Sequence, residues 1–325
     1  MLKTSPHIVV TTHVSDAVLE RLRERAEVTD VSELARPQWS TALATATGLL
    51  VNSAVKVDAA TIAAAPNARI VASVSVGYDN VDLAALARAG MALTNTRGAL
   101  VEAVADLAFS LVIIAQRRLA LAVKWVASGR WMNSHAPFGH DLANATLGIV
   151  GLGEIGSALA RRARTSGMRV VYSNRRRRTD DDRTGASFLP FERLLAEADC
   201  VVILVPLSDS TRGLFDDTAF ARMKPTAALV NVARGPIVGT DALVRALESG
   251  KIATAVLDVT DPQPLPPDHP LLSRDDVLVT PHMGSATDET RERMAQLAAE
   301  NLLAQIDGTP LLTPVELPET AEAAP

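Results

Sequence analysis

Three glycines in the stretch TLGIVGLGEIGSALARRA have the spacing of a phosphate-binding loop. Gly151, Gly153 and Gly156 follow an apolar run and stand at the start of an amphipathic segment. In that context Gly151 permits a tight turn, Gly153 lets a pyrophosphate approach the backbone, and Gly156 lets a helix pack closely against a strand. The first N–H groups of the helix and its positive dipole end then face the phosphates. The spacing therefore predicts a dinucleotide-binding loop.

The residues about 20 positions beyond such a loop decide which dinucleotide is favoured, and an Asp or Glu there binds the ribose 2′-hydroxyl of NAD. Here the apolar run RVVYS is followed by Asn174, Arg175 and Arg176, and no acid stands at its tip. Guanidinium groups bind a 2′-phosphate, which a carboxylate would repel. We therefore expect a preference for NADP(H), with NAD(H) possible. Arg175 and Arg176 are the expected contacts, while Arg177 and Arg178 are expected to be solvated.

The elements that must position these residues alternate along the chain. Short β-branched runs are separated by amphipathic segments such as SDAVLERLRERAE and GTDALVRALESG. This alternation predicts an α/β fold with parallel sheets covered by helices on both faces, and the strands are apolar throughout, as doubly buried sheets require. The predicted strands are residues 7–12, 48–52, 70–75, 145–150, 169–173, 200–205, 227–232, 253–259 and 277–280.

Two helical stretches indicate where one domain interrupts another. A long helical pattern over residues 101–126 separates an early group of strands from a later one, and a final helix follows His282, with Ser285 and Asp288 spaced like a capping box. We expect a smaller domain from residues 1–100 and 285–325, with a larger domain of residues 101–284 inserted in it. The larger domain would bind the dinucleotide and the smaller one the substrate.

Composition excludes several classes of protein. The 325 residues are 48% hydrophobic with a net charge of −5, which favours two globular domains over a general binder of nucleic acids or membrane surfaces. The most apolar helical stretch, residues 107–115, is too short to span a bilayer. Cys200 is the sole cysteine and lies in an apolar strand, so it is expected to pack in the core. With no export signal visible at the N-terminus, a cytoplasmic protein is expected.

Several further segments resemble the D-isomer-specific 2-hydroxyacid dehydrogenase family. They are SVGYDNVDL (75–83), GLGEIG, NVARGPIV (231–238), LDVTDPQPLPPDHPLL (257–272) and TPHMGSATDETR (280–291), and they occur in the family's order. Within the family, YSNRRRR, ARGPIV and PHMGSAT look most like glyoxylate/hydroxypyruvate and 2-ketogluconate reductases. The resemblance implies hydride transfer between NADP(H) and a small 2-keto or 2-hydroxy acid. It also implies a homodimer, with a Rossmann cofactor domain inserted in a smaller flavodoxin-like substrate domain.

The resemblance assigns the catalytic roles to Arg234 and His282. A planar guanidinium at Arg234 can bind the carboxylate of a 2-keto acid through two hydrogen bonds and orient its carbonyl. His282 would protonate the carbonyl oxygen as the hydride arrives, or accept the proton in the reverse direction. Of the six histidines, only His282 joins a predicted strand end to a Gly-Ser turn and a helix.

The resemblance also implies a wider set of ligand contacts. Backbone groups of Val76 and Gly77 would complete the carboxylate pocket, and Asp258 would contact the nicotinamide carboxamide unless it serves only its turn. The other implied cofactor contacts are Gly151, Gly153, Glu154, Ile155, Gly156, Asn174, Arg175, Arg176, Pro206, Val232, Ala233 and Gly284, and Ser285 completes the substrate set. No metal site is expected, because no His, Cys, Asp or Glu cluster has ligand spacing.

One catalytic position departs from the family pattern. The family carries a Glu that hydrogen-bonds the histidine and raises its pKa, whereas this chain has Gln263 there, and Asp261 is displaced by two positions. Gln263 can orient the imidazole but supplies no negative charge. We therefore expect the pH optimum of reduction to lie to the acid side, and expect Gln263→Glu to move the falling limb to higher pH.

Other interpretations remain open at this point. Gln263 within PQP also resembles the formate dehydrogenases, although the arginine run and Leu100 argue against that chemistry. A protein impaired in catalysis that senses NADP(H) is a further alternative, and the presence of both Arg234 and His282 favours the enzyme. Arg97 replaces the usual Pro of the family; it is interpreted as an exposed loop residue, and otherwise as a ligand for a second anionic group of the substrate.

Overall fold

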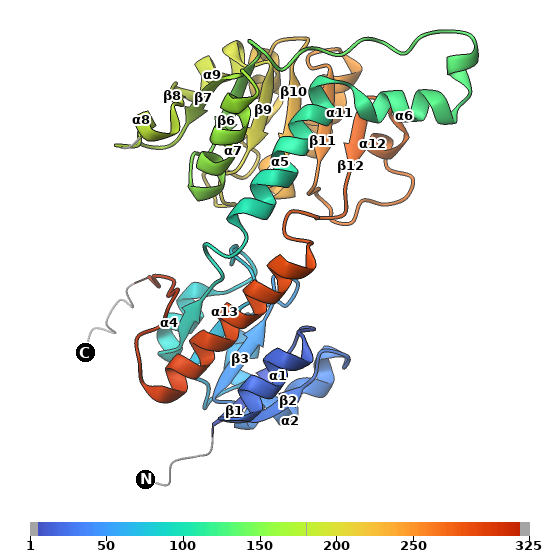
Figure 1. Cartoon of the computed structure of the whole chain (residues 1–325). Coiled ribbons are helices and arrows are strands. Elements are labelled where there is room, and N and C mark those ends of the chain that lie inside the picture. Colours follow the sequence, from blue (N-terminus) through green and yellow to red (C-terminus); the bar gives the residue numbers. More distant parts are fainter. Residues whose placement is uncertain (1–5, 180, 319–325) are drawn as a thin grey trace. The chain divides into compact units, whose positions relative to one another are not determined.

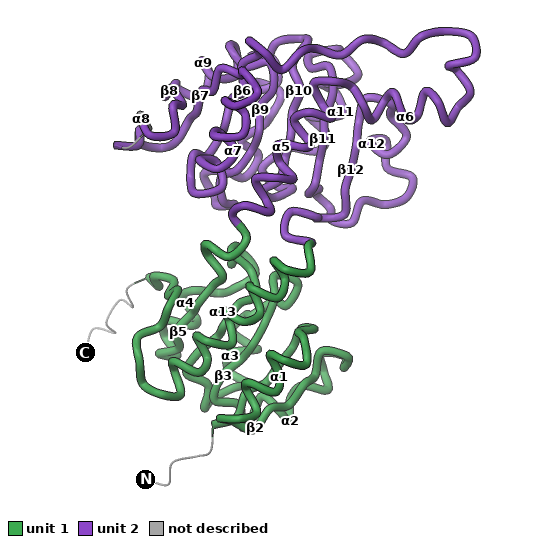
Figure 2. The backbone as a smooth tube through the Cα atoms, viewed as in Figure 1, with its two compact units in different colours: residues 1–100, 287–325 green, residues 101–286 purple. Residues whose placement is uncertain are grey.

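The computed structural model describes residues 6–179 and 181–318. The described chain forms two compact units (Figure 2). Unit 1 contains the segments up to residue 100 and from residue 287 onward, and unit 2 contains residues 101–286 between them. In the chain, one unit is therefore inserted into the other.

Unit 2 contains a seven-stranded sheet in the order β12-β11-β10-β9-β6-β7-β8, and every neighbouring pair is parallel. The strand order reverses between β6 and β9, which is the switch point of the sheet. Strands β6, β7 and β8 have the order of a Rossmann half, and β9 to β12 extend the sheet in the other direction. The fold class predicted from the alternation is thereby confirmed. The strands are β6 (Thr146–Val150), β7 (Arg169–Ser173), β8 (Ser187–Phe188), β9 (Cys200–Ile203), β10 (Ala228–Asn231), β11 (Thr254–Leu257) and β12 (Val277–Val279).

Both faces of this sheet are buried. Successive residues of β9 enter opposite hydrophobic clusters, since Val201 packs with Leu194 and Phe220 while Cys200 packs with Leu111 and other residues of the second cluster. Cys200 is fully buried, which confirms its predicted place in the core, and this burial raises the pKa of its thiol. The α-helices of unit 2 are α5 (Val101–Gln116), α6 (Leu119–Ala127), α7 (Glu154–Thr165), α8 (Asp181–Thr184), α9 (Phe191–Glu197), α10 (Asp217–Arg222), α11 (Thr240–Glu248) and α12 (Pro270–Ser273) (Figure 1).

Unit 1 contains a five-stranded parallel sheet in the order β2-β1-β3-β4-β5, the strand order of flavodoxin-like folds. The final helix, α13 (Asp288–Asp307), packs against β3, β4 and α1 and so completes the unit with the C-terminal part of the chain. The remaining elements are β1 (His7–Val10), β2 (Glu27–Asp30), β3 (Gly48–Val51), β4 (Ile70–Ser73), β5 (Ala92–Thr94), α1 (Asp16–Arg23), α2 (Ser40–Thr45), α3 (Ala59–Ala64) and α4 (Leu83–Ala89).

Several element boundaries differ from the sequence-based expectations. All nine predicted strands are present, but β2, β5 and β8 were not expected, because β2 is a partly exposed edge strand and the other two are very short. The expected helix over residues 101–126 is two helices, α5 and α6, because Arg118 adopts a left-handed φ of 50°. The cap of α13 is Thr287, whose side chain accepts the N–H of Thr290, so the predicted capping box at Ser285 is wrong.

Within residues 6–179 and 181–318, no helix combines the length and the apolar composition that a membrane span needs.

Candidate active site

The Gly-rich loop joins β6 to α7 at the switch point of the sheet, and two of its glycines are required by backbone proximity. Gly151 has a left-handed φ of 107°, and a Cβ there would lie 2.7 Å from the carbonyl carbon of Leu204. A Cβ on Gly156 would lie 2.5 Å from the carbonyl oxygen of Gly151, so only glycine lets α7 approach this turn. The geometry agrees with the turn and packing roles expected from the sequence.

The N-terminus of α7 leaves its first N–H groups without a side-chain cap. Gly153 is the cap residue, has extended backbone, and a Cβ there would meet no heavy atom within 4 Å. Glu154 and Ile155 follow in the first turn. Uncapped N–H groups at the positive end of a 12-residue helix fit the pyrophosphate of a dinucleotide.

Of the polar side chains that follow β7, some contact the Gly-rich loop and others are exposed to solvent. The side chain of Asn174 accepts the N–H of Leu152 at 2.7 Å, and the Arg178 guanidinium donates to the carbonyl oxygen of Leu152 at 3.0 Å. Both residues therefore fix the Gly-rich loop. Arg178 is half-buried rather than solvated, so that expectation is wrong: its side chain supplies a donor that the loop carbonyl needs. Arg175 and Arg176 are exposed next to this loop.

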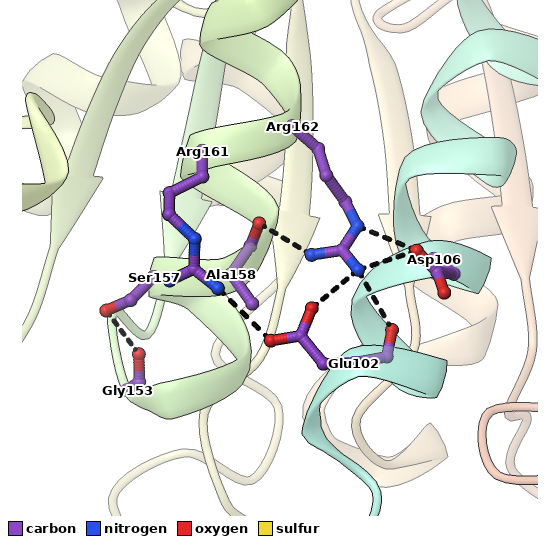
Figure 3. Close-up of polar contacts among 7 residues, drawn as sticks. All are labelled: Glu102, Asp106, Gly153, Ser157, Ala158, Arg161 and Arg162. Atoms are coloured by element: carbon purple, nitrogen blue, oxygen red, sulfur yellow. Dashed lines mark hydrogen bonds and ion pairs between the residues drawn. The ribbon is translucent and has the colours of Figure 1, made fainter.

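Charged side chains join α7 to α5 (Figure 3). The Arg162 guanidinium donates to Glu102 at 2.7 Å and to Asp106 at 2.8 Å, while Arg161 donates to Glu102 at 3.1 Å. Burial opposes the charge of Arg162, but the hydrogen bonds to the two carboxylates outweigh burial and raise the pKa of Arg162. Helix α7 is thus fixed to the first two turns of α5.

Arg234 lies just beyond β10 in a turn that its neighbours define. The side chain of Asn231 accepts the N–H of Ala233 at 3.0 Å and donates to the carbonyl oxygen of Arg234 at 2.9 Å. A Cβ on Gly235 would lie 1.9 Å from the carbonyl oxygen of Thr260, so the segment after β11 runs directly against this turn. The half-buried Arg234 side chain also donates to the carbonyl oxygen of Ala233 at 2.9 Å.

A buried carboxylate shapes the turn that carries His282. Asp258, only 1% exposed, follows β11 and accepts the Thr280 hydroxyl at 2.6 Å, the N–H of Met283 at 2.7 Å and the N–H of Gly284 at 2.9 Å. His282 adopts a left-handed φ of 57° inside this turn, and its N–H donates to the carbonyl oxygen of Asp258 at 3.0 Å. The Asp258 carboxylate therefore fixes the histidine backbone.

Gln263 and His282 form the side-chain pair that the sequence predicts. The amide Nε2 of Gln263 lies 3.0 Å from the imidazole Nδ1 of His282, and the Gln263 oxygen accepts a long 3.4 Å hydrogen bond from the N–H of Thr260. In this arrangement the amide donates to Nδ1, which places the ring proton of a neutral His282 on Nε2. Gln263 thus orients the ring while adding no charge.

These residues gather at one edge of the sheet. Arg234 and His282 follow β10 and β12, with β11 between them, and the Gly-rich loop follows β6. Because all seven strands are parallel, their carboxyl ends share one edge, where open α/β sheets bind ligands. Of the other residues expected to contact a ligand, Pro206 is exposed, and Ala233 and Ser285 are half-buried. Val232 and Gly284 are buried, so a ligand would contact their backbone rather than their side chains.

Val76 and Gly77 belong to unit 1 and follow β4. The carbonyl oxygen of Val76 accepts from the Asn95 amide at 3.0 Å, and that of Gly77 accepts from the Ser75 hydroxyl at 2.7 Å. Their own N–H groups donate to no residue in the described part of the chain. Two adjacent N–H groups on a half-exposed loop are suited to an anion.

Four functional residues of the site were not expected from the sequence. They are Asn95, Arg178, Asn231 and Thr280, and each fixes a loop that carries an expected site residue. The position of Asn231 directly after an apolar run is a turn signal, whereas the other three depend on contacts between distant segments. In the described ranges there is no cluster of three or more His, Cys, Asp or Glu side chains that could hold a metal ion.

Comparisons with known proteins bear on this site. The sequence model for the NAD binding domain of D-isomer specific 2-hydroxyacid dehydrogenases matches residues 109–284. A glyoxylate/hydroxypyruvate reductase B from Klebsiella pneumoniae is 42% identical over 311 residues, covering 93% of this chain and 96% of that protein. A glyoxylate reductase from Korarchaeum cryptofilum is 46% identical over 252 residues, 76% of each chain.

Solved structures agree with the sequence comparison. An NADPH-dependent glyoxylate/hydroxypyruvate reductase from Sinorhizobium meliloti, in complex with NADP and malonate, has a TM-score of 0.85 at 34% identity and covers 97% of this chain and 98% of its own. A glyoxylate reductase from Paecilomyes thermophila has a TM-score of 0.89 at 31% identity over 96% and 98% of the two chains. The chain therefore belongs to the D-isomer-specific 2-hydroxyacid dehydrogenases, oxidoreductases whose Rossmann domain binds a nicotinamide cofactor.

Proposed function

We propose that this protein is an NADP(H)-preferring reductase of small 2-keto acids of the glyoxylate, hydroxypyruvate or 2-ketogluconate type. The observation that carries the proposal is the placement of Arg234, His282 and the Gly-rich loop at one edge of a single parallel sheet. The names of the relatives support the same substrate class.

The preference for NADP(H) rests on the end of β7. Arg175 and Arg176 are exposed beside the Gly-rich loop, and no carboxylate side chain follows the strand directly. The side chain of Asn174 accepts the N–H of Leu152, so the two arginines are the donors proposed for a 2′-phosphate. The structural neighbour from Sinorhizobium meliloti, which is named as NADPH-dependent, supports this choice.

The chain's own residues would divide the chemistry as follows. In unit 2, Arg234 binds a carboxylate of the substrate and directs the carbonyl. In unit 1, the N–H groups of Val76 and Gly77 are donors for a substrate carboxylate. The bound nicotinamide supplies the hydride. His282 donates a proton from Nε2 to the carbonyl oxygen, and Gln263 holds the ring at Nδ1. By turning its amide, Gln263 can donate to a bare Nδ1 or accept from a protonated one.

Two direct assays test this function. NADPH oxidation is followed with glyoxylate, hydroxypyruvate and 2-ketogluconate, and NADPH binding is measured separately in the absence of a 2-keto acid. We expect turnover with at least one of the three acids and a higher kcat/KM with NADPH than with NADH. Tight NADPH binding without turnover of any 2-keto acid would favour a sensor of the nucleotide instead.

We also propose that the protein is a cytoplasmic homodimer. Helix α6 has no buried residue, and it and the following segment expose several large apolar side chains: Leu119, Val123, Val126, Trp131, Met132 and Phe138, the last 88% exposed. A continuous stretch of this kind is typical of a surface covered by another chain. The cytoplasmic location rests on the single reduced and buried cysteine.

A further inference from the structure

Arg97 lies beside the loop that we assign to the substrate carboxylate. Strands β4 and β5 pair in parallel with Ala72 opposite Thr94, and beyond them the N–H of Thr96 donates to the carbonyl oxygen of Ser75 at 2.9 Å. This hydrogen bond does not continue the strand register, which would pair the N–H of Thr96 with the carbonyl oxygen of Ser73, and Arg97 directly follows the residue that contacts Ser75. Neighbouring strands are about 4.8 Å apart, which is less than the length of an extended arginine side chain.

Asn95 fixes the two loops to each other. Its amide donates to the carbonyl oxygen of Val76 at 3.0 Å, and its side-chain oxygen accepts the N–H of Arg97 at 3.2 Å. Asn95 is 8% exposed, and the Thr313 hydroxyl donates to its carbonyl oxygen at 2.6 Å. The backbone of Arg97 therefore has a defined position relative to Val76 and Gly77.

The charges and donors of this region are arranged for more than one anionic group. The N–H groups of Val76 and Gly77 donate to no described residue, and the exposed Arg97 side chain forms no hydrogen bond or ion pair within residues 6–179 and 181–318. A carboxylate at the two N–H groups would use both of them. A guanidinium at the adjacent position then favours a second negative group on the same molecule.

We propose that Arg97 is a specificity-determining residue that binds a second carboxylate of the substrate, so that dicarboxylic 2-keto acids are preferred over monocarboxylic ones of equal length. This proposal rests on the assignment of Val76 and Gly77 to the substrate carboxylate. The Arg97 side chain is exposed, so its guanidinium is accessible to a ligand.

The test compares substrates that differ only in the second carboxylate. Oxaloacetate and 2-oxobutyrate have equal chain length, and the ratio of their kcat/KM values with NADPH reports recognition of that group. We expect the ratio to favour oxaloacetate in the native enzyme and to fall roughly 10- to 100-fold in Arg97→Ala, as expected for a hydrogen bond to a charged group. Arg97→Lys should retain part of the ratio, because it keeps the charge.

A matched control removes a charge from elsewhere in unit 1. Arg88 is exposed in the last turn of α4, so it precedes β5 and lies at the opposite end of that strand from Arg97. Arg88→Ala should keep the native substrate ratio. If Arg97→Ala and the native enzyme have the same ratio of kcat/KM for oxaloacetate to kcat/KM for 2-oxobutyrate, and both still reduce glyoxylate, the role of Arg97 is overturned while the proposed function stands. Absence of turnover with every 2-keto acid overturns the proposed function itself.

Discussion

The amide Nε2 of Gln263 lies 3.0 Å from Nδ1 of His282, at the position where the family resemblance implies a carboxylate. The histidine of this chain is therefore oriented by a neutral partner. A neutral amide gives the imidazolium no charge stabilisation, whereas a carboxylate at the same distance would favour the protonated ring. This difference makes the pH dependence of the reaction a direct probe of the pair.

Gln263→Glu should raise the pKa of His282, because the new carboxylate attracts the imidazolium charge. Reduction uses the protonated ring, so the falling limb of kcat/KM against pH should move to higher pH. The pH profile of NADPH oxidation with glyoxylate measures the shift. Gln263→Leu, which removes the hydrogen bond without adding charge, should lower kcat without that upward shift. Identical profiles for Gln263→Glu and native protein would refute the role of the pair.

Asp258→Asn should disturb the turn that carries His282, since an amide NH2 cannot accept the N–H of Gly284 or Met283 as a carboxylate oxygen does. Misplacement of the histidine is expected to lower kcat by about 10- to 100-fold. Thr280→Val removes only the hydroxyl that donates a hydrogen bond to Asp258, and it should lower kcat less than Asp258→Asn does. Steady-state kinetics on folded variants, checked by circular dichroism, measure both; unchanged kcat in Asp258→Asn would show that the turn does not need this carboxylate.

Arg175→Asp should lower the ratio of kcat/KM with NADPH to kcat/KM with NADH by about tenfold or more, because a carboxylate repels the 2′-phosphate. Arg178→Ala should instead weaken the binding of NADPH and of NADH to a similar degree, since Arg178 donates to the carbonyl oxygen of Leu152 in the Gly-rich loop. Kinetics with both nucleotides separate the two effects. An unchanged ratio in Arg175→Asp, or a native enzyme that uses NADH at least as well as NADPH, would contradict the cofactor preference.

Arg162→Ala should reduce the free energy of unfolding by about 1 kcal/mol, because Glu102 and Asp106 lose their shared partner on α7. Because salt screens these ion pairs, the difference in free energy of unfolding between Arg162→Ala and the native protein should be smaller at high ionic strength. Arg161→Ala is the control, since Arg161 is more exposed and makes a single 3.1 Å contact with Glu102. Denaturant titrations at low and high salt measure both variants; equal stability of Arg162→Ala and native protein at low salt would contradict this prediction.

Val123→Glu should shift the proposed homodimer toward monomer, because it places a charge on the apolar surface of α6, where Val123 is 69% exposed. Light scattering after gel filtration measures the mass over a range of protein concentrations. Leu34→Glu changes an apolar side chain that is 45% exposed in unit 1 and should leave the mass unchanged. A native protein that elutes as a monomer would refute the proposed assembly.

Much of the fold was predictable because its signals are local. The alternation of apolar runs and amphipathic segments predicted nine strands and the α/β class, and the glycine spacing placed the loop between β6 and α7. A strand such as β2 was not predictable in this way, because its sequence EVTD is partly exposed and its pairing with β1 is decided only when the sheet forms. The cap of α13 was misassigned because Ser285 and Thr287 are both suitable cap residues by type.

The sequence by itself determined which residue types stand after each strand: Arg234 after β10, Asp258 after β11 and His282 after β12. Only the tertiary structure decided how their side chains are used. The Asp258 carboxylate turns toward Thr280 and Gly284, Arg178 toward Leu152, and Asn95 toward Val76. Each of these contacts joins segments about 20 residues or more apart, and strand order and register, rather than any local preference of the chain, bring those segments together.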